Sequence, residues 1–201
     1  MRSIILLLIA LALTATQVSA ASDPYTDIST MRIAFSHVRS VVAVERFSSG
    51  GFAAVQYARP NRFHVTMPGS QFVLTGNVEY DKRAGGTWKR SPHGAEHQAL
   101  LAAVWNVAGS PNVDVRKIFT ITSLGTKTVD RQRLRGYMLH DTGGAYDATI
   151  WIGPTYLPVA ASIEMPDQTL KIHYIAYNTS VDVAMPQAPK VSGTTVSERS
   201  P

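Results

Sequence analysis

The sequence predicts a mainly β fold, an all-β sandwich or barrel accompanied by two helices. Short segments of alternating apolar and polar residues recur along the chain, as in Phe63–Met67, where the first, third and fifth side chains are apolar. Turn signals of Gly, Pro and Asn separate these segments at short, regular intervals. This pattern is typical of antiparallel strands that turn one face toward an apolar interior.

An antiparallel meander is expected in the first half of the chain. Arg59–Arg62 predicts a tight turn, because Pro60 fixes φ and Asn61 tolerates turn geometry. Further turns are expected at Pro68–Ser70 and at the glycines that follow. The strands predicted here are Ser40–Phe47, Ala54–Ala58, Phe63–Met67, Gln71–Thr75, Val78–Asp81 and Thr87–Arg90.

Strands are expected again from Val115 to Met185, with turn signals that include Gly125, Gly136 and Gly153–Pro154. The predicted strands are Val115–Thr122, Thr126–Arg131, Arg135–Asp141, Ala145–Ile152, Val159–Met165, Thr169–Tyr177 and Val181–Met185.

Two segments have helical spacing instead. Asp23–Ser40 has an Asp-Pro start and places Ile28, Met31 and Phe35 on one face, which is expected to pack on the sheet. Ser91–Ala108 ends at a Gly-Ser-Pro sequence. Its apolar stripe consists of Leu100, Leu101, Val104, Trp105 and Ala108.

The ends of the chain carry different signals. Residues 1–20 predict a secretory signal peptide cleaved after Ala20, because Arg2 precedes an apolar core, Ile4–Leu13, that is too short to span a membrane. No Cys follows, so no lipid anchor is expected. Residues 21–186 are predicted to form one domain, and residues 187–201 lack periodicity and are expected to be a disordered tail.

Composition excludes several classes of site. The sequence has 201 residues and no Cys, which removes disulfides and thiolate metal sites. The formal net charge is +5, but the basic residues are dispersed except in Arg131–Arg135. That cluster is interpreted as a solvated hairpin end, so no nucleic-acid partner is expected.

The run Arg59-Pro60-Asn61, then Phe63 with alternating apolar residues, Pro-Gly, and a hydrophobic strand resembles the periplasmic lipoprotein-carrier (LolA-like) superfamily. The resemblance covers residues 25–186 and is strongest at 53–90 and 145–178. It implies a curved, incomplete antiparallel β-barrel covered by lid helices. It also implies a monomeric periplasmic carrier of lipid or lipoprotein acyl chains, with an inner-membrane releasing complex and an outer-membrane receptor as possible partners.

The predicted ligand-binding residues come from two strands and one helix. If Arg59 points to the concave face, alternation puts Val55 and Tyr57 there too, and Phe63, Val65 and Met67 can share it after the turn. The resemblance implies that Arg59 reaches lid-helix carbonyls and that Phe63 lies at the cavity mouth. It also implies a lid role for the predicted helix that carries Leu100, Leu101, Val104 and Trp105.

Two other functions stay open. The same fold could serve as an envelope sensor or interaction module. His93-Gly94-Ala95-Glu96-His97 matches the H-x-x-E-H order of zinc hydrolases. However, Gly94 weakens the helix that would hold both ligands, and a β-rich chain does not suit that family's scaffold. The sequence therefore predicts a binding protein without catalytic residues, metal or cofactor.

Overall fold

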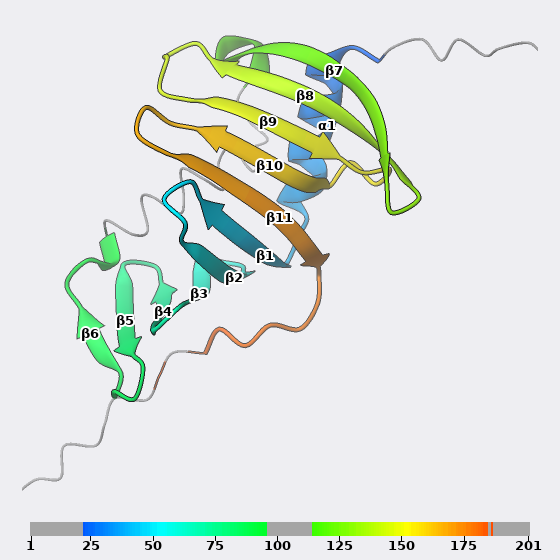
Figure 1. Cartoon of the computed structure of the whole chain (residues 1–201). Coiled ribbons are helices and arrows are strands. Elements are labelled where there is room, and N and C mark those ends of the chain that lie inside the picture. The colour runs from blue at the N-terminus through cyan, green and yellow to red at the C-terminus, as the bar shows by residue number, and fades with distance from the viewer. Residues whose placement is uncertain (1–21, 96–113, 185, 187–201) are drawn as a thin grey trace, which may run out of the picture.

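The computed structural model describes residues 22–95, 114–184 and 186 of the chain (Figure 1). These residues form an 11-stranded antiparallel sheet, helix α1 (Pro24–Ser36) and the 3-10 turn η1 (Val115–Lys117). The order of strands is β6-β5-β4-β3-β2-β1-β11-β10-β9-β8-β7. The sheet is open, because β6 and β7 lie at its two edges.

The first six strands form one half of the sheet and the last five form the other half. The first half consists of β1 (Ser40–Phe47), β2 (Phe52–Ala58), β3 (Arg62–Met67), β4 (Ser70–Thr75), β5 (Val78–Arg83) and β6 (Lys89–Ser91). The second half consists of β7 (Phe119–Val129), β8 (Gln132–Asp141), β9 (Asp147–Ile152), β10 (Pro158–Glu164) and β11 (Thr169–Tyr177).

The predicted meander is confirmed. The bounds of β1 and β11 are those expected, and most other strands differ by one to three residues at their ends. Several expectations are wrong. Ser91 ends β6, so the predicted helix Ser91–Ala108 does not begin there; residues 96–108 lie outside the described part of the chain. Residues 181–184 form no strand, although the side chain of Val183 is buried.

The third correction concerns β7, which replaces two predicted strands. Val115–Lys117 forms η1, because Asp114 caps it by accepting a hydrogen bond from the Arg116 N–H. Beyond it β7 continues through Gly125, which has a φ of +79° and shifts the register by a bulge instead of turning the chain. The turn itself is made by Asp130 and Arg131, both with positive φ.

Gly136, which was expected to mark a turn, lies inside β8 beneath an aromatic ring. A Cβ atom at this position would lie 2.6–2.9 Å from three ring atoms of Trp151 on β9. The ammonium group of Lys127 lies 3.6 Å from the centre of the same ring. Only glycine leaves room for the indole to lie this close to the backbone. Besides bulges, such close approaches are a common reason for a glycine within a strand.

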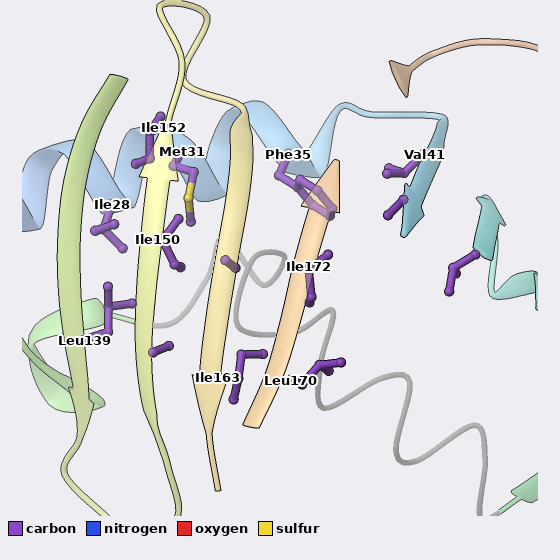
Figure 2. Close-up of a cluster of buried hydrophobic side chains, with 14 of the residues drawn as sticks. Ile28, Met31, Phe35, Val41, Leu139, Ile150, Ile152, Ile163, Leu170 and Ile172 are labelled. Atoms are coloured by element: carbon purple, nitrogen blue, oxygen red, sulfur yellow. The ribbon is translucent and has the colours of Figure 1, made fainter. Parts of the chain in front are cut away.

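Helix α1 packs on one face of the sheet, as predicted. Figure 2 shows Ile28, Met31 and Phe35 projecting from α1 toward strand residues such as Ile150 and Ile172. The exposed fractions of the three helix side chains are 0–3%. We call the face of the sheet that these side chains contact the inner face. None of the helices in the described residues has the length and apolar character needed to cross a membrane.

The two halves of the sheet are joined where β1 pairs with β11. Val41 lies opposite Tyr177, and the pairing continues to Phe47 and Leu170. The junction is closed by Asn178, whose side-chain oxygen accepts a hydrogen bond from the Arg39 N–H at 2.7 Å. One continuous inner face therefore extends across all eleven strands (Figure 1).

Replacing Gly136 with Ala is expected to destabilise the fold by about 1–3 kcal/mol, because the added methyl group must displace the Trp151 ring. Chemical denaturation of both proteins measures the change in the free energy of unfolding. Gly51→Ala is the matched control, since a Cβ there would meet only Phe47 at 3.6 Å. Equal effects of the two substitutions would contradict the close contact.

Candidate functional site

Strands β2 and β3 bring five of the ten predicted ligand-binding residues onto the inner face. Val55 lies opposite Val65 and Tyr57 opposite Phe63 in the antiparallel register, so each pair shares one face. The ring centres of Tyr57 and Phe63 are 4.9 Å apart. Met67 packs against the same core. The prediction that these side chains share a face is confirmed, and their contact with a ligand stays a prediction.

A cavity of about 410 Å³ lies over the inner face of the first half of the sheet. This volume is within the range of small-molecule sites, roughly 300–1,000 Å³. Most of its lining surface is apolar, although polar and charged residues of β1, β4, β5 and β6 also reach it. The described lining residues are Glu45, Phe47, Ala53, Val65, Met67, Ser70, Gln71, Phe72, Glu79, Asp81, Arg83, Ser91 and His93.

Only some of the predicted ligand-binding residues line this cavity. Val65 and Met67 line it. Val55 and Phe63 are buried in the core, and Tyr57 packs on that core. Leu100, Leu101, Val104 and Trp105 lie outside the described residues, so their predicted place in a lid is not tested.

Arg59, directly after β2, contacts the carboxyl end of α1. Its Nε donates a hydrogen bond to the Val38 carbonyl at 2.6 Å, and its Nη2 donates to the Phe35 carbonyl at 3.4 Å. The last carbonyls of a helix lack partners within the helix and carry partial negative charge, which a guanidinium compensates. The contact is of the kind that the resemblance implies for Arg59, and its role as a latch stays a prediction.

Aromatic rings also surround the carboxyl end of α1. The Phe35 ring makes edge contacts with Tyr174 and Tyr177 on β11, at centre distances of 6.5 and 6.2 Å. The Tyr177 hydroxyl donates a hydrogen bond to the Pro158 carbonyl at 2.6 Å. Burial raises the pKa of Tyr177 well above its ordinary value, so its hydroxyl keeps this proton at neutral pH.

The amino end of α1 is held by a buried ionic cluster that the sequence analysis did not find. Asp27 has an exposed fraction of 1%, and both of its oxygens lie 3.1 Å from Nη1 of Arg135 on β8. The hydroxyls of Tyr137 and Ser22 also donate hydrogen bonds to it. Burial and then the Asp27 hydrogen bond raise the pKa of Tyr137 to about 12, so its hydroxyl remains a donor.

A sequence signal for this cluster exists. Asp27 lies four residues before Met31 and eight before Phe35, so it falls on the apolar stripe of α1, where a charge requires a partner. Arg135 was interpreted as part of a solvated hairpin end. That interpretation holds for Arg131 and Arg133, which are exposed, but it is wrong for Arg135, which is half-buried and lies 4.2 Å from the Tyr156 ring centre.

Two buried carboxyl groups on the inner face, Glu45 and Glu79, were also absent from the predicted site. Glu45 lies on β1. Its exposed fraction is 6%, and it lies opposite Ala53 on β2 and Ile172 on β11. Burial raises the pKa of Glu45 to about 7. The alternation of β1 signals this position, because Glu45 follows Val41 and Ala43 at period two.

The zinc-hydrolase alternative gains no support from the described residues. His93 lies in a turn before the helical residues Gly94 and Ala95, and Glu96 and His97 fall outside the described part of the chain. Among the residues described, no three His, Asp or Glu side chains are grouped so that they could hold a metal ion.

Solved structures share this fold at low sequence identity. Lipoprotein LppX from Mycobacterium tuberculosis matches with a TM-score of 0.60 and 16% identity, over 81% of this chain and 100% of that chain. LprF from Mycobacterium bovis matches with a TM-score of 0.57 and 15% identity, over 81% and 96%. No protein-family model matches the sequence, and a search of curated proteins found no match. The predicted open antiparallel sheet is confirmed, and these two structures share its fold.

The wild type is expected to lose stability as the pH rises, because the buried Glu45 becomes charged. Replacing Glu45 with Gln is expected to remove this loss. The pKa of this group is 4.5 in the unfolded chain and about 7 when folded. Because the folded protein binds this proton more tightly than the unfolded chain, the group stabilises the native state fully below about pH 4.5. This contribution is lost as the pH rises through about 7. The free energy of unfolding of the wild type, relative to the variant, should fall by about 3 kcal/mol over this range.

Urea denaturation of both proteins at about pH 4, 6 and 8 measures this difference. Comparing the two proteins at each pH cancels the titration of all other groups. A difference that stays constant across the range would contradict a buried carboxyl group at this position.

Proposed function

We propose that this protein is an exported binding protein that holds a lipid or a lipoprotein acyl chain on its inner face and transfers it between sites of the cell envelope. The observation that carries the proposal is the apolar cavity of about 410 Å³ over the first half of the sheet. The proposal includes the cleavable signal at residues 1–20, a periplasmic location, and membrane-bound donor and acceptor partners.

The expected energetics separate the roles of the residues. Burial of an acyl chain supplies roughly 0.8 kcal/mol for each methylene group, so several buried methylenes exceed any single polar contact. The hydrogen bonds of Arg59 to helix carbonyls contribute about 1.5–3 kcal/mol. Affinity would therefore come from side chains such as Val65, Met67 and Phe72, whereas Arg59 would set how readily α1 moves.

Mass spectrometry of the mature protein, first native and then after extraction with organic solvent, tests the proposal. A bound lipid at near-stoichiometric amount is the expected result. An empty protein that also fails to take up added lipid would contradict the proposal and favour an interaction module of the same fold. Stoichiometric zinc would instead revive the hydrolase alternative.

A matched pair of substitutions locates the binding site. Met67→Gln places an amide in the cavity lining and is expected to weaken lipid binding about tenfold, because the amide loses water without gaining a partner. Met138→Gln makes the same change at a side chain of β8 that is 44% exposed, and it should leave binding unchanged. Equal effects would contradict a site on the inner face.

Replacing Arg59 with Ala is expected to speed the exchange of a bound fluorescent fatty acid about tenfold without abolishing its uptake, because the carboxyl end of α1 loses its contact with the end of β2. Stopped-flow fluorescence measures the exchange rate. Arg62→Ala is the control. It removes an exposed arginine of the same turn, whose side chain donates to the Arg59 carbonyl and not to α1 among the described residues. Unchanged exchange in Arg59→Ala would contradict the latch.

A further inference from the structure

Two pairs of basic residues meet in the hairpin of β5 and β6. Lys82 and Arg83 end β5, on one side of the turn. Lys89 and Arg90 begin β6, on the other side, and the antiparallel pairing places Asp81 opposite Lys89. We call the four basic residues the basic edge. Figure 1 shows this hairpin at the end of the sheet farthest from α1, so the fold gathers there charges that are separate in the sequence.

The charged groups of the basic edge are accessible. Arg83, Lys89 and Arg90 are exposed, and Lys82 is half-buried. Within the described part of the chain, none of the four forms an ion pair. Their positive charge is therefore available to a partner outside the molecule.

The carboxyl groups near the basic edge are turned toward the cavity. Glu79 has an exposed fraction of 2%, and Asp81 is half-buried. Both line the cavity together with His93 and with Glu45, which is buried on β1. Strands β5 and β6 contain four basic and two acidic residues, which is a net charge of +2. Because the acidic side chains are the more buried, the outward surface of the hairpin is positive.

An indole and an uncharged turn lie beside the basic edge. Trp88 directly precedes β6 and is half-buried, and its ring centre lies 6.0 Å from the ammonium group of Lys82. Residues 84–87 form the exposed turn and carry no charge. Tryptophan is enriched at membrane interfaces, because its ring is apolar and its N–H is polar. This turn can therefore approach lipid headgroups without the desolvation of a charged group.

The basic edge also borders the cavity. Arg83 is exposed and lines the cavity, and Ser91, the last residue of β6, lines it as well. A flat surface held by the basic edge would therefore lie beside the cavity and not against α1.

We infer that the basic edge docks this protein on the surface of a bilayer that contains anionic phospholipid. The inference rests on the proposed carrier function and names the surface with which the cavity exchanges lipid. The four basic side chains supply the attraction, and Trp88 with its turn enters the headgroup region. Attraction of this kind is reversible and is screened by salt, which suits a carrier that must leave the membrane again.

Cosedimentation with sucrose-loaded vesicles measures the docking. The wild type is expected to bind vesicles with about 30% phosphatidylglycerol in phosphatidylcholine about tenfold more tightly than vesicles of phosphatidylcholine alone, and about 0.5 M NaCl should remove this preference. Equal binding to both vesicles would overturn the inference. Retention on heparin without binding to the anionic vesicles would also overturn it, because the basic edge would then serve a soluble polyanion.

Two double variants with the same loss of formal charge locate the docking surface. Lys89→Gln with Arg90→Gln is expected to weaken binding to the anionic vesicles about tenfold. Arg131→Gln with Arg133→Gln removes two exposed charges at the β7–β8 hairpin and should change binding by about twofold or less. Equal weakening in the two variants would show that net charge governs binding, and it would overturn the inference.

Quenching of tryptophan fluorescence tests the orientation. Anionic vesicles that carry a spin-labelled phosphatidylcholine headgroup are expected to quench the wild type. Trp88→Phe should still cosediment with these vesicles but lose most of the quenching, because Trp88 is the indole beside the basic edge. Full quenching in Trp88→Phe would place another surface on the membrane and contradict the inference.

Uptake of diphenylhexatriene from solution, without vesicles, tests the proposed function separately. A wild type that takes up this apolar probe but does not bind anionic vesicles would overturn the inference and leave the proposed function intact. A wild type that takes up neither the probe nor added lipid would remove the proposed function, and the inference with it.

Discussion

The position of helix α1 on the sheet depends on the buried carboxylate of Asp27. This charge would be costly to bury alone, and its hydrogen-bond donors compensate it. Asp27 accepts hydrogen bonds from Arg135, Tyr137 and Ser22 in a region that water does not reach. Removal of one partner from such a cluster leaves an unpaired buried charge and strongly destabilises the fold. Replacement of the whole cluster by apolar side chains would change the stability much less. Asp27 therefore fixes one position of α1, because a helix that slides along the sheet must break the hydrogen bonds of Asp27 to Arg135 and Tyr137 on β8. Its apolar stripe alone would not impose that restriction.

The two ends of α1 are attached differently, and this difference bears on motion. The amino end is joined to β8 by buried, charged contacts. The carboxyl end is joined to β2 by Arg59, which donates to backbone carbonyls, and to β11 by aromatic contacts of Phe35. Aromatic and carbonyl contacts can be exchanged for similar ones at modest cost, whereas an isolated Asp27 cannot lose its partners cheaply. Any movement of the helix is expected to pivot about its amino end.

Much of this architecture follows from local sequence. Alternation along 40–67 predicts the strands and the shared face of Val55 and Val65, because a period of two leaves no other arrangement for a half-buried strand. The sequence is ambiguous where a residue type has two uses: Gly125 produces a bulge and Gly136 accommodates Trp151, and both resemble turn glycines. The contacts of Asp27 and Glu45 depend on long-range packing. Both residues lie on apolar stripes, which marks them as buried, but the partners of Asp27 and the neighbours that bury Glu45 come from elements that no local pattern specifies.

The junction of β1 with β11 has a consequence for how the chain reaches its fold. Val41 lies opposite Tyr177, so β1, the first strand of the chain, pairs with β11, the last strand. Contacts so far apart in sequence close large loops and form slowly. During synthesis the first half can build its meander, but the sheet stays divided until nearly the whole chain has emerged. A polypeptide with this order of strands can complete its sheet only after β11 has been synthesised, so the edge of β1 that pairs with β11 stays open until late in synthesis.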